Sequence, residues 1–315
     1  MFWQGATGQV LLGFLSNLLF VLILTAVGVV YVSAVLSRRS RPLRRLFGIG
    51  EHLPNKVRIM VSSIYLRQGG ALGVDGPIGF YGPVMNQSEY VSAQLLRDAI
   101  RTRPASRPLR ALLDQLGLLD TVHDPIVCDI EFSPQYVDGK DGRPIAAHEY
   151  QPPKLPGDDR IVKLVEDSMK ESGVYILVGG PAFNVVVAHI LSDKHAPLTL
   201  DRSRALVVAR GDGEPERTYQ QRREGSVLVD YFVLQKISEY GSQKSTVFVC
   251  AGLSSLGTAA AVGQLASRWR HLEDKYGGKD FALLYEFDNR RNVALPAAED
   301  VDKALATVKE PIWQR

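Results

Sequence analysis

An uncharged apolar run near the amino terminus constrains this chain more than any other feature. Residues 10–36 read VLLGFLSNLLFVLILTAVGVVYVSAVL, and RRSRPLRR follows after one serine. A helix needs about 20 apolar residues to cross the hydrocarbon core of a bilayer, which is roughly 30 Å thick. This run is longer, so it can span a membrane with some tilt. The sequence therefore predicts one transmembrane helix.

Five arginines directly after the run predict its orientation: Arg38, Arg39, Arg41, Arg44 and Arg45. Residues 1–9 contain no Lys or Arg, so the positive-inside rule places the amino terminus outside and the rest in the cytoplasm. A cleavable signal peptide is the alternative, but its positive charge precedes a shorter apolar stretch. We therefore predict an uncleaved anchor of the inner membrane over residues 1–50. The arginines can also bind anionic lipid headgroups, although topology alone explains them.

Charge and cysteine content limit the function of the remaining domain, residues 51–315. The net charge of the chain is +3, and it becomes −2 when the five arginines are set aside. A domain without a basic face is a poor ligand for nucleic acid, which we therefore do not expect as a partner. Cys128 and Cys250 form neither a disulfide framework nor a CxxC pair, as is typical of a reducing cytoplasm.

Apolar strands alternate with helical segments in this domain. Strands are predicted at residues 57–66, 122–132, 173–178, 205–209, 226–237, 245–251 and 281–287, and helices at 88–100, 107–120, 182–191, 259–277 and 299–308. This alternation predicts an α/β fold with a Rossmann-like, mostly parallel sheet and helices on both faces. Leu177, Val178, Val249 and Leu284 are expected in its buried central strands. Residues 133–159 are rich in Pro, Gly and Asp, which indicates a loop insertion.

Three strand ends are followed by glycine-rich turns. In a parallel sheet such turns emerge at the carboxyl edge, where ligands bind. Glycine lets backbone N–H groups approach an anion, and the next helix adds partial positive charge. The candidate ligand-binding residues are Ser62, Ser63, Gly179, Gly180, Asn184, Gly252, Ser254, Ser255, Gly257 and Thr258. The alternative is that the glycines only permit tight turns.

Motifs for common enzyme chemistries are missing from the sequence. It contains neither GxxxxGK[ST] nor a GxGxxG after a strand, and Gly252–Leu256 lacks the closing glycine of GxSxG. The six histidines have no zinc-binding spacing, so no metal site is predicted. Glu286 and Asp288 lie on one side of their strand and are candidates for acid/base catalysis. Carboxylates at strand ends also serve in ion pairs or lie in solvent.

Residues 245–277 contain a strand, the Ala251-Gly252…Gly257-Thr258 loop and a helix. This unit resembles the phosphate corner of the SLOG (LOG/Smf-DprA-like) Rossmannoid superfamily, whose pattern is GGxGTxxE. The resemblance implies binding or cleavage of nucleotides, and several members sense nucleotides beside membrane segments. In this chain four residues separate Gly252 from Gly257, and Ala261 occupies the acid position, which argues against phosphoribohydrolase chemistry. The VGGPxxN element at 178–184 is similar to one in a group of bacterial proteins.

The sequence thus favours a membrane-anchored cytoplasmic domain that binds a nucleotide or similar phosphorylated small molecule. An enzyme that cleaves an N-glycosidic bond is the first alternative, and a non-enzymatic membrane scaffold is the second. The expected partners are the lipid bilayer and a small phosphorylated ligand, with a homo-oligomer left open. The sequence identifies no cofactor.

Overall fold

The computed structural model describes residues 3–50, 53–62, 64–65, 83–84, 87–101, 125–134, 137–138, 143–144, 159–181, 184–192, 196–201, 205–211, 213, 215–289, 297–308 and 310–315. The chain divides into two compact units, which we describe separately. The smaller contains Met1–Leu43, and the larger comprises Arg44–Arg101 and Ile126–Arg315. The predicted helix at 107–120 lies outside the described residues.

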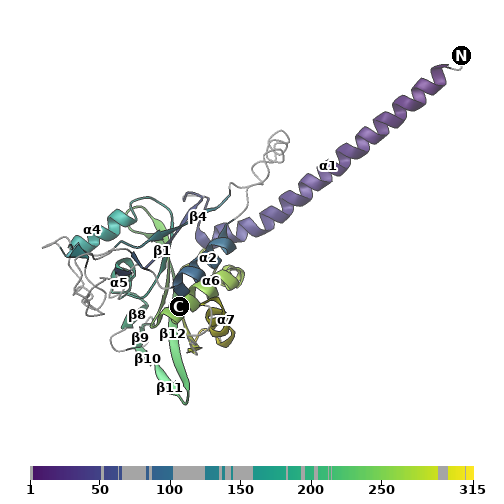
Figure 1. Ribbon diagram of the computed structural model, residues 1–315. Helices are drawn as coiled ribbons and strands as arrows, with labels where there is room; N and C mark the ends of the chain where they lie inside the picture. The colour runs from purple at the N-terminus through teal and green to yellow at the C-terminus, as the bar shows by residue number, and fades with distance from the viewer. Residues whose placement is uncertain are drawn as a thin grey trace, which may run out of the picture. The chain divides into compact units, whose positions relative to one another are not determined.

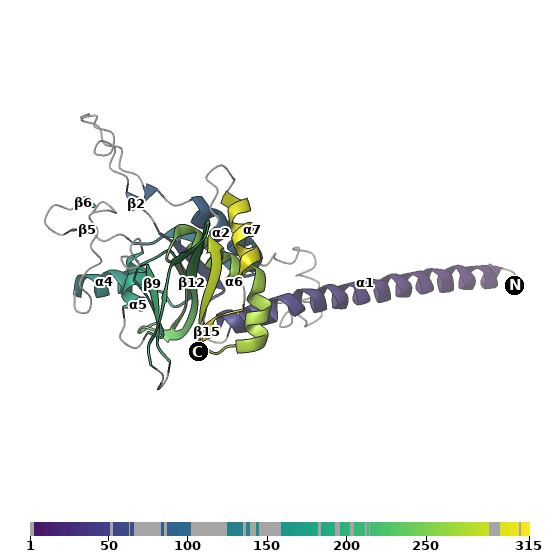
Figure 2. The ribbon, with the colours of Figure 1, turned by 90° about the horizontal axis from the view of Figure 1, so that it is seen from below.

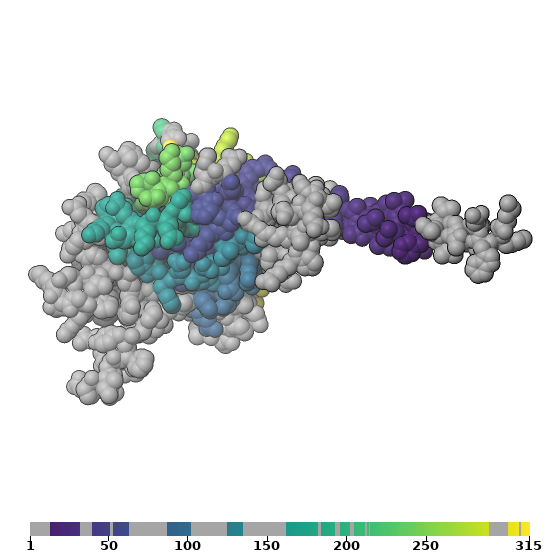
Figure 3. Space-filling view, turned by 90° about the horizontal axis from the view of Figure 1, so that it is seen from above, coloured from purple at the N-terminus to yellow at the C-terminus, as the bar shows by residue number. Residues whose placement is uncertain are grey.

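The long helix α1 (Trp3–Phe47) contains the apolar run. Its segment Gly13–Tyr31 is long and apolar enough to cross a membrane, with a mean hydropathy of 2.3. Nearly all side chains of this segment are exposed, as the purple atoms in Figure 3 show. Exposed Leu, Phe and Val side chains are unfavourable in water and favourable in lipid. Length and composition alone fit a signal sequence equally well.

The last turn of α1 belongs to the larger unit. Leu46 and Phe47 are completely buried there, and the ring of Phe47 lies 4.8 Å from the ring of Phe248. Arg45 Nε lies 3.0 Å from Glu273 Oε1. The core of the larger unit therefore includes residues that the sequence analysis assigned to the anchor.

An eight-stranded sheet forms the centre of the larger unit (Figure 1). The order of its strands is β15 (Trp313–Gln314), β14 (Phe281–Asn289), β12 (Val227–Tyr240), β13 (Ser245–Gly252), β7 (Val174–Val178), β1 (Lys56–Val61) and β4 (Val127–Phe132), with β11 (Arg222–Glu224) beside β12. The pairs β4–β1, β1–β7 and β7–β13 are parallel. The predicted parallel core is confirmed, and the four expected central-strand residues are completely buried.

Strand β12 makes the sheet mixed. It runs antiparallel to both of its neighbours, β13 and β14, so β14 again points in the direction of the parallel core. β15 is antiparallel to β14. β12 and β13 form a β-hairpin, in which only four residues connect the two antiparallel strands.

Helices cover both faces of the sheet, as predicted (Figure 2). The helices α2 (Gln87–Ile100), α6 (Ser255–Tyr276) and α7 (Ala297–Thr307) pack together on one face. The helices α4 (Asp159–Ser168) and α5 (Val185–Leu191) contribute Val165 and Val187 to the core on the other face. There they meet Leu177 and Val249 of the central strands.

The strand predicted at 205–209 lies outside the main sheet. It is β9 (Leu206–Ala209), the middle strand of an antiparallel sheet with β8 (Leu198–Asp201) and β10 (Arg217–Gln220). Its alternating burial, unlike the continuous burial of β7, is typical of a sheet with one covered face. The strand predicted at 57–66 is divided: β1 ends at Val61, and β2 (Ile64–Tyr65) pairs with β3 (Pro83–Val84) outside the main sheet. Within the loop insertion predicted at 133–159, β5 (Val137–Asp138) pairs with β6 (Arg143–Pro144).

Candidate functional site

The three glycine junctions converge at one edge of the sheet. The strand order reverses at β1, because β4 follows it on one side and β7 on the other. At the carboxyl ends, Ser62 N donates to Val178 O (3.0 Å) and Gly179 N donates to Cys250 O (3.2 Å). A Cβ at Gly180 would lie 3.3 Å from Gly252 O. The fold therefore brings together the three loops that the sequence predicts to converge. Ser63 lies outside the described residues.

Gly179 is required by backbone geometry and by its neighbours. Its φ is +130°, a conformation that side chains of L-residues rarely adopt. A Cβ there would lie 2.2 Å from Ser62 Oγ and 2.9 Å from Ser62 Cβ. Gly179 therefore permits the close approach of Ser62, which follows β1.

Asn184, a predicted ligand-binding residue, uses its side chain to cap a helix. It is the N-cap of α5 and is completely buried. Its Oδ1 accepts from Val186 N (3.1 Å), Val187 N (3.2 Å) and Ser133 Oγ (2.9 Å), while Nδ2 donates to Val178 O (3.2 Å). This pattern satisfies two of the orphan donors at the start of the helix.

Ser62 is likewise engaged inside the protein. Its buried hydroxyl donates to Glu89 Oε2 (2.8 Å), in the first turn of α2. A carboxylate at the start of a helix also interacts favourably with the helix dipole. The polar groups at the ends of β1 and β7 therefore connect strands to helices. Glu89 and Ser133 were missed by the sequence analysis, because neither lies in a glycine junction.

The loop after β13 uses most of its polar groups on itself. Gly252 N donates to Thr258 Oγ1 (3.2 Å), and the same hydroxyl donates to Ser254 O (3.3 Å). Thr258 is 1% exposed, and both hydrogen bonds that the structure describes for its hydroxyl lie within this loop. A Cβ at Gly252 would overlap Gly257 C and Thr258 N at 2.4 Å. Gly257 faces Tyr231 O, 3.2 Å from its would-be Cβ, so it packs the helix onto the sheet.

Ser254 belongs to a polar cluster around Asp230, a residue that the sequence did not single out. It is the N-cap of α6, and its hydroxyl accepts from Gly257 N (3.0 Å) and donates to Asp230 Oδ2. Asn289 Nδ2 donates to the same carboxylate oxygen (2.9 Å), and Tyr231 N donates to Oδ1 (2.8 Å). Asp230 is completely buried. An acidic residue within the apolar strand sequence VLVDYFVL was the available signal, since a buried charge requires such partners.

The start of α6 keeps two donors free. In the described part of the chain, the N–H groups of Ser255 and Leu256 have no hydrogen-bond partner, whereas Gly257 N and Thr258 N bond to Ser254. Orphan N–H groups of this kind occur in the first turn of every helix and attract anions. Of the predicted residues, Ser255 therefore retains a donor for a ligand.

The candidate catalytic carboxylates point away from α6. Glu286 pairs in register with Tyr231 of β12, and its Oε2 accepts from the Tyr231 hydroxyl (3.0 Å) and from Arg222 Nη1 (3.1 Å). Burial and the carboxylate together raise the pKa of Tyr231 to about 12. Glu286 is thus a member of an ion pair, which was the alternative in the sequence analysis. Asp288 lies two residues further along the same side, and its backbone N–H donates to Thr307 Oγ1 (3.0 Å).

Comparison with known proteins finds no family model, curated protein or solved structure that matches the chain. The resemblance to SLOG domains therefore remains a prediction. Among the residues that the structure describes, His, Cys, Asp and Glu form no group of three or more that could hold a metal ion.

Proposed function

We propose that this protein is a membrane-anchored, Rossmann-like domain that binds a nucleotide or a similar phosphorylated small molecule. The anchor is α1, inserted with its amino terminus outside, so that the larger unit lies in the cytoplasm. The exposed apolar segment Gly13–Tyr31 and the arginines after it support this orientation.

The observation that carries the ligand proposal is the pair of free N–H groups at the start of α6. Ser255 and Leu256 supply them, at the edge of the sheet where the ends of β1, β7 and β13 converge. A 22-residue helix has a partial positive charge at this end. The expected contacts to a phosphoryl group are therefore mainly to the backbone, with the Ser255 hydroxyl as a third donor. The side chains of Ser254, Thr258 and Asn184, of which the last two are buried, shape the loops.

The structure provides less support for the enzyme alternative. Glu286 is held by Arg222 and Tyr231 on the opposite face of the sheet from α6. A general acid or base must reach the reacting bond through a hydrogen bond, directly or through one water. We therefore propose binding without assigning a reaction.

Replacing Ser255 by Pro tests the backbone contact. Proline is favoured at the first helical position, and Ser254 already has the extended conformation (φ −116°, ψ 169°) that a following proline requires. Ser255→Pro thus removes one N–H with little cost to the fold. Ser255→Ala, which keeps the N–H and removes the hydroxyl, is the matched control.

The measurement is binding of a nucleotide panel to the full chain in detergent, by calorimetry and thermal shift. We expect one or more nucleotides to bind the parent and Ser255→Ala, and Ser255→Pro to bind about tenfold more weakly. If no nucleotide binds the parent, the proposed function is wrong. Equal binding by all three chains would place the ligand elsewhere.

A further inference from the structure

Strand β4 forms one edge of the main sheet, and no other strand of the described residues pairs with its outer side. Val127 N donates to Asn55 O and Ser133 N donates to Val61 O, both at 2.8 Å. In a parallel ladder alternate residues face the neighbouring strand. The N–H and C=O groups of Cys128, Ile130 and Phe132 therefore point away from β1, and they have no partner in the part of the chain that the structure describes.

The same strand exposes apolar and acidic side chains. Val127 and Phe132 are 50% and 46% exposed. Asp129 and Glu131 share one side of the strand, and their side chains are 47% and 41% exposed. A row of unpaired backbone groups flanked by such side chains is a template for pairing with another strand.

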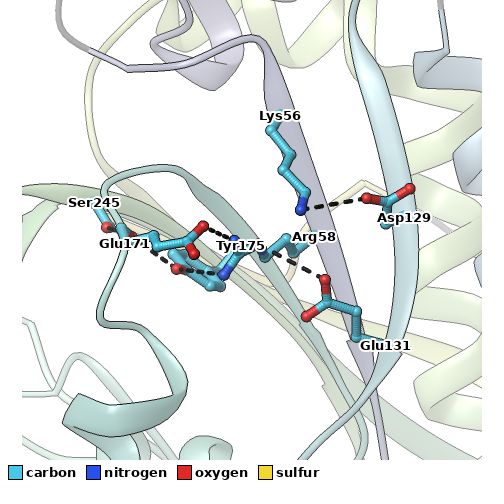
Figure 4. Close-up of polar contacts among 7 residues, drawn as sticks. All are labelled: Lys56, Arg58, Asp129, Glu131, Glu171, Tyr175 and Ser245. Carbon is cyan, nitrogen blue, oxygen red and sulfur yellow. Dashed lines mark hydrogen bonds and ion pairs between the residues drawn. The ribbon is translucent and has the colours of Figure 1, made fainter.

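Figure 4 shows that each of these acidic side chains forms an ion pair with a cation of β1. Lys56 Nζ lies 3.5 Å from Asp129 Oδ2, and Arg58 Nε lies 3.7 Å from Glu131 Oε1. Arg58 is shared, because its guanidinium also pairs with Glu171 and donates to the Tyr175 hydroxyl (3.2 Å). Three carboxylates thus face two cations on this face of the sheet. Arg97, Asp98 and Arg101 lie near Cys128, whose side chain is on the other face of β4, so the excess of negative charge belongs to the side that carries Asp129 and Glu131.

A second copy of the chain is a poor occupant of this edge. Antiparallel pairing about Ile130, the middle outward residue, would place Asp129 directly opposite Glu131 of the second copy. Like charges directly opposite each other destabilise a strand pair. An occupant with basic side chains at those positions would instead meet two half-exposed carboxylates.

We propose that the edge of β4 binds an extended segment of another protein by strand addition, and that this segment carries Lys or Arg at alternate positions. Backbone hydrogen bonds to Cys128, Ile130 and Phe132 provide affinity, and Asp129 and Glu131 select the basic side chains. The site involves neither the membrane span nor the loops at the carboxyl edge.

Ile130→Pro tests the backbone part of this proposal. It removes an outward N–H without removing any hydrogen bond between β4 and β1, and proline is tolerated in edge strands. Ile130→Val keeps the N–H and the strand propensity, and serves as the matched control. The probes are a labelled peptide of alternating Lys and Val, and its counterpart of alternating Glu and Val. Binding to the full chain in detergent is followed by fluorescence anisotropy.

We expect the basic peptide to bind the parent and Ile130→Val, with affinity that falls as salt is raised, and Ile130→Pro to lose about tenfold or more. Glu131→Lys should weaken the basic peptide and strengthen the acidic one, and it tests the proposal even if Ile130→Pro does not fold. Equal binding of both peptides, or unchanged binding by Ile130→Pro with a native thermal transition, would overturn the proposal. Dimerisation of the parent that Ile130→Pro abolishes would overturn it in favour of self-pairing.

Discussion

The hydroxyl of Ser254, which caps α6, donates to the carboxylate of Asp230, and that carboxylate is completely buried in β12. This contact ties the start of the helix to the antiparallel strand of the sheet. It also places a negative charge beneath the helix end whose free N–H groups we propose to bind a phosphoryl group.

Asp230→Asn should therefore strengthen anion binding. A carboxylate near a bound phosphate raises the free energy of the complex, and the effect is large where water is excluded. We expect several-fold tighter binding of the nucleotides that bind the parent, together with a loss of stability because Ser254 and Asn289 lose an acceptor. Calorimetry and urea unfolding measure the two effects. Unchanged affinity would show that the anion lies far from Asp230.

Gly179→Ala should destabilise the larger unit strongly. The methyl group would overlap the side chain of Ser62, and alanine would be strained at φ +130°. We expect a loss of at least about 2 kcal/mol in the free energy of unfolding. Gly213→Ala is the control, since it also has a positive φ (+75°) but open space around its Cα. A similar, small effect at both positions would contradict the role of the overlap.

Phe47→Ala should destabilise the larger unit although Phe47 lies at the end of α1. Its ring is completely buried against Phe248, and truncation of a buried Phe costs about 3 to 5 kcal/mol. Phe14→Ala is the matched control, because Phe14 is 69% exposed in the apolar segment of the same helix. Urea unfolding in detergent, followed by near-UV circular dichroism, compares them. Equal unfolding midpoints for the two variants would show that the last turn of α1 does not contribute to the stability of the core.

Lys236→Met should change the pH dependence of stability. Lys236 is 2% exposed, its Nζ donates to Gly278 O (2.6 Å), and burial lowers its pKa to about 8. Between pH 8 and about 10 the unfolded chain binds a proton that the folded chain does not, so this lysine makes stability rise with pH. The buried thiols of Cys128 and Cys250 act oppositely, since burial raises the pKa of each, but they are present in both chains.

The measurement is urea unfolding of parent and Lys236→Met at pH 7, 8, 9 and 10. The difference in stability between the two chains should be constant below pH 8 and shift in favour of the parent above it. A constant difference over the whole range would show that Lys236 keeps its proton on folding.

Reporter fusions test the proposed topology. A cytoplasm-active reporter fused after Arg315 should give a signal, and a periplasm-active one should not, because Lys and Arg remain on the cytoplasmic side. Moving the five arginines to residues 2–6 should weaken or invert insertion. A periplasmic signal from the unmodified chain would reverse the orientation.

The strands of the core could be predicted because their apolar runs are continuous. β7 and β13 are buried along their whole length, which matches the sequences GVYILV and STVFVCA. The direction of β12 could not be predicted, since an apolar strand reads the same in parallel and antiparallel pairs. The separate sheet was missed because β8 and β10, which flank β9, are short and were not predicted as strands.

The convergence of the three glycine loops could be predicted from the sequence, whereas the hydrogen-bond partners of their side chains could be predicted only in part. A Ser, Thr or Asn at the start of a helix suits a ligand and suits capping equally well, because both use the same hydrogen bonds. Burial decides between them, and it depends on tertiary packing that a local motif does not reveal; Asn184, for example, bonds to Ser133 from 51 residues earlier in the chain. Asp230 and Glu89 were missed because their partners, Ser254 and Ser62, come from other segments of the chain.

During translation Phe47 is synthesised well before Phe248, the residue against which its ring packs. About 200 residues separate them, which at 5–20 residues per second corresponds to roughly 10–40 s of translation. Throughout that time α1 is complete, but Phe248 of β13, against which the ring of Phe47 packs, has not been synthesised. The nascent chain therefore passes through a period in which apolar groups of the future core are accessible to chaperones and to the bilayer surface.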